Sequence, residues 1–300
     1  MDKLLVILGP TATGKTKFSV QIASKYSGEI ISADSRQIYK DMNVGTGKDL
    51  EEYCFKDKII PYHLIDILKP NINYSVYQFK QDFFKSYDVI NKKQSLPILC
   101  GGTGFYIESV LLNYDMPHIG PNHILRKEYD QKDLDTLIEI LIDLDKKSYH
   151  REFHITKRRI IRTIEIIQSG EKKNNQSIRN IDNPLIIGLQ LDRSEVLENI
   201  KIRLHERLKS GMVEEVKQFI DKGMTLKRLE YFGLEYKFIG KYLFNEMDYE
   251  TMTERLNFAI NQFSKRQMSF FRRMEKRGLK IHWLSPKNQI AANELIENYL

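Results

Sequence analysis

The chain has 300 residues, of which 41% are hydrophobic and 29% are charged, and this is enough for one α/β domain of about 200 residues plus a smaller insert. Its formal net charge of +7 is too small by itself to indicate a polyanionic partner. Two cysteines, Cys54 and Cys100, exclude a disulfide framework, and no apolar run approaches the roughly 20 residues of a membrane span. The first apolar run, 4–8, is also too short for a signal peptide. We therefore expect a monomeric cytoplasmic protein with no membrane contact.

Short apolar runs alternate with helical patterns in the N-terminal third of the chain. The predicted buried strands are 4–8, 29–33, 63–67 and 96–100, and the predicted helices are 15–26 and 76–91. Alternation of this kind is typical of a parallel sheet with helices on both faces.

The pattern changes at a boundary marked by Pro117, Gly120 and Pro121. Two helical patterns follow, at 134–141 and 160–167, and Gly170 is placed to end the second. The polar stretch 171–183 is predicted to be a loop. We therefore predict a helical insertion domain at 117–183.

Pro184 precedes an apolar run at 185–191, which is expected to return the chain to the sheet. Two helices and then a long helix at 252–276 are predicted to follow. The apolar stripe of the long helix is expected to contain Leu256, Ile260, Phe263, Phe270 and Met274. Residues 1–116 and 184–300 would thus form one α/β core domain.

The first strand runs into the sequence GPTATGKT, which matches the phosphate-binding pattern G-x-x-x-x-G-K-[ST] in its proper place between a strand and a helix. The predicted phosphate-binding residues are Gly9, Pro10, Thr11, Ala12, Thr13, Gly14, Lys15 and Thr16. Backbone N–H groups and the helix N-terminus attract an anion, Lys15 adds a full charge, and the Thr16 hydroxyl suits Mg²⁺. The motif alone leaves open which phosphate compound binds, and ATP or GTP would indicate a kinase or NTPase.

Two further strand ends carry polar residues. Asp34 follows the second strand, and its carboxylate is interpreted as a metal partner, a general base or a helix cap. Gly101, Gly102 and Thr103 follow the fourth strand, either as a second set of anion donors or as a turn that the threonine caps. Because ligands collect at the carboxyl ends of parallel strands, we expect these residues beside the phosphate loop.

Taken in order, five blocks of the sequence resemble the bacterial tRNA dimethylallyltransferases, also called tRNA isopentenyltransferases. The blocks are GPTATGKT at 9–16, SADSRQIYKDMNVGTGK at 32–48, GGTGFYIESVL at 101–111, KRRIIRTIE at 157–165 and SKRQMSFFR at 264–272. The second and third are the most specific. The resemblance spans nearly the whole chain and implies a P-loop NTPase-like parallel sheet flanked by helices, with an inserted all-helical subdomain.

The resemblance also implies an activity. The enzyme would transfer a dimethylallyl group from dimethylallyl diphosphate to the exocyclic amine of the adenosine 3′ to the anticodon, giving N6-isopentenyladenosine and diphosphate. Asp34 would accept the proton of the amine, Thr103 would steady the departing oxygen, and Lys15 and Mg²⁺ at Thr16 would hold the diphosphate. Residues implied to contact the tRNA anticodon stem-loop are Asp34, Ser35, Arg36, Gln37, Thr103, Arg126, Arg158, Arg159, Arg162, Lys265, Arg266, Gln267 and Arg272.

One stretch departs from the family pattern. Where the family has basic residues near a Gly-Tyr-Arg/Lys segment, this chain has Glu230 and Glu235. Arg228 and Lys237 are both candidates for the missing cation, and the sequence does not choose between them.

Two basic clusters, at 151–162 and 265–280, favour a polyanionic partner, although each could also be a solvated helix face. Three alternatives remain at this stage: a transferase acting on free adenylate, a P-loop small-molecule kinase that binds ATP, and a tRNA-binding protein without catalysis. The first would need neither two basic clusters nor a helical insert. The second would need a lid with arginines over ATP, and the sequence has no clear adenine-binding segment. The phosphate loop, Asp34 and Thr103 argue against the third.

Overall fold

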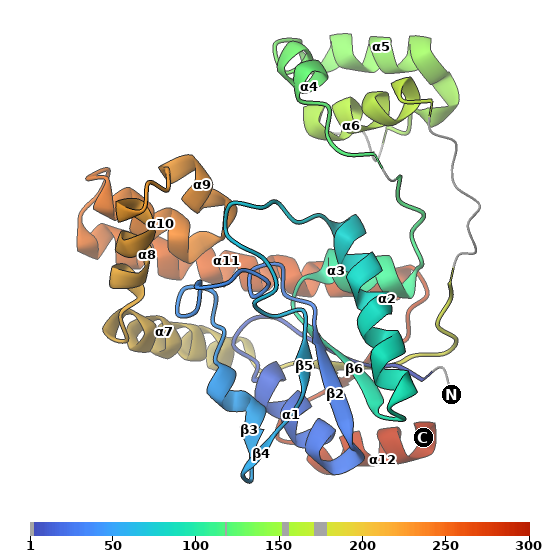
Figure 1. Cartoon of the computed structure of the whole chain (residues 1–300), viewed down its shortest axis with the longest axis vertical. Coiled ribbons are helices and arrows are strands. Elements are labelled where there is room, and N and C mark those ends of the chain that lie inside the picture. Colours follow the sequence, from blue (N-terminus) through green and yellow to red (C-terminus); the bar gives the residue numbers. More distant parts are fainter. Residues whose placement is uncertain (1–2, 118, 152–155, 171–178) are drawn as a thin grey trace. The chain divides into compact units, whose positions relative to one another are not determined.

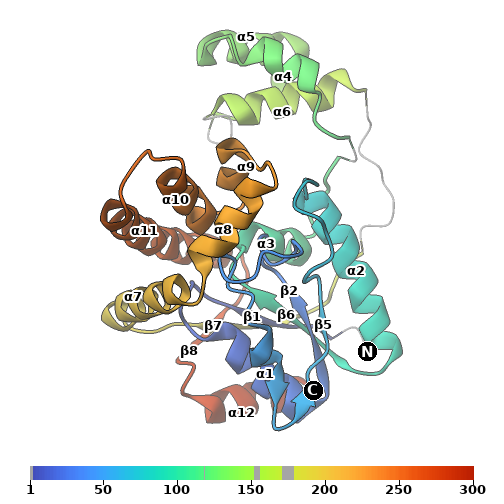
Figure 2. The ribbon, with the colours of Figure 1, turned by 60° about the vertical axis from the view of Figure 1, so that its left-hand side comes forward.

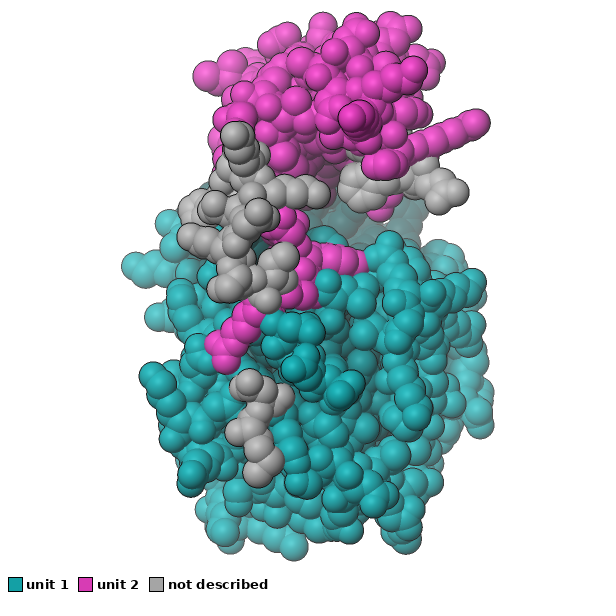
Figure 3. Space-filling view, turned by 90° about the vertical axis from the view of Figure 1, so that its right-hand side faces the viewer, with its two compact units in different colours: residues 1–112, 180–300 teal, residues 113–179 magenta. Residues whose placement is uncertain are grey.

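The computed structural model describes residues 3–117, 119–151, 156–170 and 179–300. The chain divides into two compact units, one formed by residues 1–112 and 180–300 and the other by residues 113–179 (Figure 3). The sequence placed these boundaries at 117 and 183. Much of the loop predicted at 171–183 lies outside the described residues. None of the described helices combines the length and the apolar character that crossing a bilayer requires.

The larger unit is built on a six-stranded sheet in which every neighbouring pair is parallel. Its strand order is β5-β2-β6-β1-β7-β8. The strands are β1 (Leu5–Leu8), β2 (Gly28–Ser32), β5 (Tyr62–His63), β6 (Leu96–Gly101), β7 (Leu185–Leu189) and β8 (His282–Leu284). A short antiparallel pair, β3 (Cys54–Phe55) and β4 (Lys58–Ile59), lies outside this sheet. The predicted parallel sheet is confirmed.

Helices cover both faces of the sheet (Figures 1 and 2). Successive strand residues point to opposite faces, so Ile7 and Ile98 pack in one core while Val6 and Leu99 pack in the other. The first core includes α1 (Lys15–Tyr26) and α12 (Gln289–Tyr299). The second includes α2 (Val76–Lys92), α3 (Gly104–Leu111) and the helices that follow β7.

Five helices lie between β7 and β8 in the chain: α7 (Arg193–Lys209), α8 (Met212–Asp221), α9 (Leu226–Tyr231), α10 (Leu234–Leu243) and α11 (Tyr249–Lys276). The prediction of two helices before the long one was wrong, because four are present. Gly211 and Gly233, with φ of 90° and 126°, stand at the N-caps of α8 and α10 and divide a continuous apolar pattern into short helices.

Two other details of the prediction were wrong. The strand expected at 63–67 ends at His63, because Leu64 and Asp66 have left-handed backbone conformations with φ of 61° and 55°. Phe263, which was expected in the apolar stripe of α11, is 40% exposed. Phe271, eight residues further along α11, is buried.

The smaller unit is helical in its described part and has a core of its own. It contains α4 (His123–Tyr129), α5 (Leu134–Asp145) and α6 (Lys157–Gln168). Among the described residues there are also two 3₁₀ helices: Leu50–Tyr53 in the larger unit and Lys146–Ser148 in the smaller. Leu137 and Leu141 of α5 pack against Ile160 and Ile164 of α6 in a separate cluster.

Candidate active site

Three strand ends bring the predicted site residues together. In the sheet β6 lies between β1 and β2, so the segments that leave these strands lie side by side. The approach is close: a Cβ on Gly101 would lie 2.3 Å from the carbonyl oxygen of Ala33, so only glycine fits there. The phosphate loop, Asp34 and Thr103 all border one cavity of about 900 Å³ in the larger unit.

The phosphate loop places some of its residues in this cavity and uses others to hold its own shape. Lys15 and Thr16 line the cavity, together with Thr11, Ala12 and Gly14. Thr13 is buried, and its hydroxyl donates to the Pro10 carbonyl at 2.9 Å. Gly9, Pro10 and Thr13 are therefore structural parts of the loop and not part of the cavity lining.

Lys15 lies in an environment that disfavours its protonated, charged form. Its ammonium donates to the Pro10 carbonyl at 2.7 Å. Burial lowers the pKa of Lys15 to about 8, and the nearby Arg203 acts in the same direction. An anion bound in the cavity would favour the protonated form, so anion binding and protonation of Lys15 are coupled.

Asp34 and Thr103 border the cavity at the next two strand ends. The Oδ1 atom of Asp34 accepts from the backbone N–H of Arg36 at 2.8 Å. Residues 35–38 form a turn, so Asp34 caps a turn and not a helix. The Thr103 hydroxyl does not cap α3 but accepts from the backbone N–H of Ser35 at 3.1 Å. The interpretation of Thr103 as a helix cap was therefore wrong.

Gln267 of α11 joins the two glycine loops. Its side chain is 8% exposed, its Oε1 accepts from the Thr11 backbone N–H at 2.8 Å, and its Nε2 donates to the Gly102 carbonyl at 2.9 Å. The sequence assigned Gln267 to tRNA contact. In the structure both ends of the amide bind the protein's own backbone, so Gln267 holds the site together.

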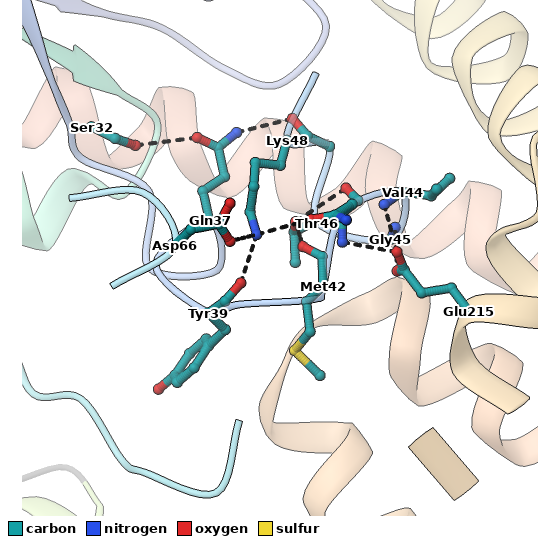
Figure 4. A network of polar contacts seen from close by, with 12 residues as sticks. Ser32, Gln37, Tyr39, Met42, Val44, Gly45, Thr46, Lys48, Asp66 and Glu215 are labelled. Carbon is teal, nitrogen blue, oxygen red and sulfur yellow. Dashed lines mark hydrogen bonds and ion pairs between the residues drawn. The ribbon is translucent and has the colours of Figure 1, made fainter. Parts of the chain in front are cut away.

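Arg36 and Gln37 are also engaged within the protein, although both border the cavity. The Arg36 guanidinium donates to the Tyr231 carbonyl and lies 5.3 Å from the centre of the Tyr231 ring. Gln37 donates to the Gly47 carbonyl at 3.0 Å and accepts from the Ser32 hydroxyl at 3.2 Å (Figure 4). Ser35, between Asp34 and Arg36, lines the cavity too.

Two cavity cations, Arg203 and Arg207 of α7, were missed in the sequence. The Arg203 guanidinium donates to the Thr11 hydroxyl, and Arg207 pairs with Asp49 at 2.9 Å. Burial lowers the pKa of Arg203 to about 10, and Arg207 adds to this effect. The sequence does contain a signal for them. The two arginines lie one helical turn apart, directly beside the buried row of Val196, Ile200 and Leu204, and a cation in that position is expected to be partly buried.

The two candidates for the missing cation have different positions. The Arg228 guanidinium donates to the Pro70 and Ile72 carbonyls and to the Asn73 side chain, and Arg228 is not part of the cavity lining. Lys237 is part of it, with its ammonium 3.7 Å from Glu230. Glu235 also borders the cavity, and burial raises the pKa of its carboxyl.

Five basic residues near the C-terminal end of α11, including its C-cap Arg277, divide into two groups. Lys265, Arg266 and Arg272 are exposed, and Arg266 borders the cavity. Arg273 and Arg277 instead pair with the buried Glu108 of α3, at 3.0 and 3.2 Å. Only the first group is available to a polyanion without breaking a contact to a buried carboxylate.

The arginines of the smaller unit differ in burial and in their contacts to Glu165. Arg126 forms a two-pronged pair with the buried Glu165, at 2.7 and 2.8 Å, and Arg162 donates to the same carboxylate at 3.1 Å and to the Ile119 carbonyl at 2.7 Å. Arg158 and Arg159, by contrast, are exposed.

The oxygen atoms at the cavity suit Mg²⁺. Among the residues that the structure describes, no group of three or more His, Cys, Asp and Glu is arranged to hold a metal ion. Mg²⁺ commonly needs no such cage, because one or two protein oxygens, water and substrate phosphates complete its coordination. The Thr16 hydroxyl and the Asp34 carboxylate, which border the same cavity, are the kind of ligands that it prefers.

The chain is similar to known proteins over nearly its whole length. Two family profiles match it: "IPP transferase" over residues 37–274 and "Isopentenyl transferase" over residues 2–58. A protein named tRNA dimethylallyltransferase 1 from Azobacteroides pseudotrichonymphae is 44% identical, covering 98% of this chain and 96% of that protein. Another of that name, from Parabacteroides distasonis, is 45% identical over 94% of this chain and 92% of its own.

Solved structures agree with this similarity. The full-length tRNA isopentenylpyrophosphate transferase of Bacillus halodurans superposes with a TM-score of 0.71 at 28% identity, covering 99% of this chain and 98% of its own. A eukaryotic dimethylallyltransferase acting on tRNA superposes with a TM-score of 0.81, over 99% of this chain and 80% of its own. At 23% identity, the second likeness shows the fold alone.

Proposed function

Since this chain belongs to the IPP transferase family, in which its relatives are tRNA dimethylallyltransferases, we propose that it prenylates an adenosine of tRNA. The donor is dimethylallyl diphosphate, the acceptor is the exocyclic amine of the adenosine 3′ to the anticodon, and the products are N6-isopentenyladenosine and diphosphate. The observation that carries this proposal is the meeting of the phosphate loop, Asp34 and Thr103 at one cavity.

The diphosphate would bind on the side of the cavity where the cations gather. An adenine amine is a weak nucleophile, so most of the lowering of the barrier must come from stabilising the leaving diphosphate. Lys15 and Arg203 flank the phosphate loop, and Arg207 lies one helical turn further along α7. Arg203, Arg207 and Lys237 would supply the positive charge that this chain lacks at Glu230 and Glu235, where the family has basic residues.

Asp34 would act as the general base. As the amine nitrogen forms its bond to the allylic carbon, the bond from that carbon to the diphosphate oxygen breaks, and the nitrogen loses a proton to the carboxylate. The hydrogen bond from the Arg36 backbone fixes the orientation of Asp34. Thr103, held at Ser35, would donate its hydroxyl proton toward the departing oxygen.

The Thr16 hydroxyl would hold Mg²⁺, and Asp34 would remain free to act as the base. When bound, this ion would neutralise part of the negative charge of the diphosphate.

The tRNA would be gripped by exposed arginines and lysines. Arg266 of α11 presents charge at the cavity, and Lys265 and Arg272 are exposed on the same helix. Arg158 and Arg159 present charge on the insertion domain. Arg126 and Arg162 would support that domain through Glu165. We also propose that the protein acts as a monomer.

Incubation with radiolabelled dimethylallyl diphosphate tests the proposal. The enzyme should label unmodified tRNA in the presence of Mg²⁺, and should label neither AMP nor tRNA in which the target adenosine is replaced. Labelling of AMP but not tRNA would show a free-adenylate transferase. Tight binding of ATP without binding of dimethylallyl diphosphate would indicate a kinase.

A further inference from the structure

Residues 39–49, between β2 and the first 3₁₀ helix, form a loop whose tip borders the cavity. Gly45, Thr46 and Gly47 are part of the cavity lining. The loop has no regular secondary structure that would fix its position, apart from an isolated bridge between Tyr39 and Leu68. Two backbone hydrogen bonds shape it, from Gly47 N–H to the Val44 carbonyl at 3.2 Å and from Lys48 N–H to the Asn43 carbonyl at 3.0 Å. Its position also depends on side chains that bind its backbone, and these act from two sides (Figure 4).

On one side, the Glu215 carboxylate of α8 binds three consecutive backbone N–H groups. Its Oε2 accepts from Asn43 at 2.8 Å and Val44 at 2.9 Å, and its Oε1 accepts from Gly45 at 3.0 Å. The Tyr236 hydroxyl donates to the same Oε1 at 2.5 Å. Burial raises the pKa of Tyr236, which keeps this hydroxyl protonated and able to donate.

On the other side, Lys48 and Gln37 hold the inner part of the loop. Lys48 is only 5% exposed, and its ammonium donates to the Tyr39 carbonyl at 2.6 Å and to the Asp66 carboxylate. Gln37 donates to the Gly47 carbonyl at 3.0 Å. The base of the loop is thus held by Lys48 and Gln37. The tip at 43–45 is held by Glu215 and by its backbone hydrogen bonds to residues 47 and 48.

The loop determines where Arg207 lies. A Cβ on Gly47 would be 2.3 Å from Nη2 of Arg207, so the guanidinium rests directly against the glycine backbone. Asp49, two residues further along the loop, pairs with the same nitrogen at 2.9 Å. A shift of the loop would therefore move or release a cation of the cavity wall.

We infer that Glu215 is a positioning residue for the anion site: it holds the 43–45 backbone, the loop holds Gly47 and Asp49, and these hold Arg207 beside the bound anion. The inference rests on the proposed function, which makes that anion the diphosphate. A glutamine cannot replace Glu215, because it has one acceptor oxygen and its NH₂ group would face backbone donors. At least one of the three N–H groups would then lose its partner.

Binding of inorganic pyrophosphate, measured by calorimetry with Mg²⁺ present, tests the inference. We expect Glu215→Gln to weaken this binding roughly tenfold, as is typical for the loss of a charge-assisted hydrogen bond. The matched control is Glu214→Gln, which removes the same charge from an exposed neighbour on α8 and should bind pyrophosphate as the wild type does. The dissociation constant for tRNA should change less than twofold in both variants.

Two further variants separate positioning from a general loss of structure. Tyr236→Phe keeps the ring that packs on Gly45 and loses only the hydroxyl, so it should weaken pyrophosphate binding in the same direction but less. In an Arg207→Ala background, Glu215→Gln should have little additional effect, because both changes remove the same interaction.

The outcomes are distinct. Wild-type binding of pyrophosphate by Glu215→Gln, equal weakening of pyrophosphate and tRNA, or full additivity with Arg207→Ala would each overturn the role of Glu215. Failure of the wild-type enzyme to bind pyrophosphate would overturn the proposed function itself, and the inference with it.

Discussion

Helices α7 and α6 both carry arginines near a buried apolar stripe, but they use them differently. On α7, Arg203 and Arg207 both face the cavity and are partly buried. On α6, Arg158 and Arg159 are exposed while Arg162 turns inward to Glu165. Spacing alone gives the face of the helix on which a cation lies. Burial and the nearest carboxylate decide whether that cation serves a small anion, a polyanion or the protein's own core.

If the reaction takes place in the cavity beside α7, the largest loss of turnover is expected from replacing a reacting side chain of that cavity. Asp34→Asn keeps the shape of the side chain and its hydrogen bond to the Arg36 backbone, but removes its basicity. Turnover should fall roughly 10²-fold or more. The dissociation constant for tRNA should change little, because Asp34 provides no phosphate contact. Steady-state kinetics with a parallel filter-binding assay check both, and near-normal turnover would remove Asp34 from the mechanism.

The second effect concerns the arginines themselves. Arg203→Ala should weaken binding of dimethylallyl diphosphate by about ten- to a hundredfold, since a partly buried cation beside the phosphate loop is lost. Arg228→Ala is the matched control, because its guanidinium binds the 70–73 loop outside the cavity lining. This variant should bind dimethylallyl diphosphate normally and melt at a lower temperature. The reverse ranking would place the missing cation at Arg228.

These variants also mark what the sequence could and could not predict. The phosphate loop, Asp34 and Thr103 follow fixed strand ends, and a parallel sheet places such ends at one edge. Arg203 and Glu215 belong to helices more than 150 residues away in the chain, and their roles depend on how α7 and α8 pack. Gln267 was recognised from its motif and predicted to contact tRNA, but its hydrogen bonds to the Thr11 and Gly102 backbone could not be read from that motif. A motif identifies a residue without saying whether its side chain faces a substrate or the backbone.

The third effect concerns pH. Because burial lowers the pKa of Lys15 to about 8, this ammonium titrates in an accessible range. Below pH 8 the lysine is charged and ready for the anion, while above it a proton must be taken up on binding. Affinity for dimethylallyl diphosphate in the absence of tRNA should therefore fall about tenfold between pH 7 and pH 9. Calorimetry across this range checks it. In Lys15→Arg the side chain stays charged, so this part of the pH dependence should vanish.

The smallest expected effect is on tRNA binding by the exposed arginines of α6. Exposure of its arginines is the property in which α6 differs most from α7. Protein groups that neutralise tRNA phosphates release counterions, and each contact adds about 0.7 to 0.9 to the slope of log K against log salt. Arg158→Ala with Arg159→Ala should reduce this slope by about one to two units, weaken tRNA binding at low salt, and leave dimethylallyl diphosphate binding intact.

The same reasoning applies to Arg266 and Arg272 of α11, but not to Arg273, whose partner Glu108 is buried. Arg273→Ala should lower the melting temperature by leaving Glu108 with one cation fewer, and should change the salt slope less than Arg272→Ala does. If Arg158, Arg159 and Arg272 can all be replaced without any change in the slope, then these faces are only solvated. The tRNA would in that case be held at the cavity edge alone, where Arg36 and Arg266 are the remaining cations outside the phosphate site.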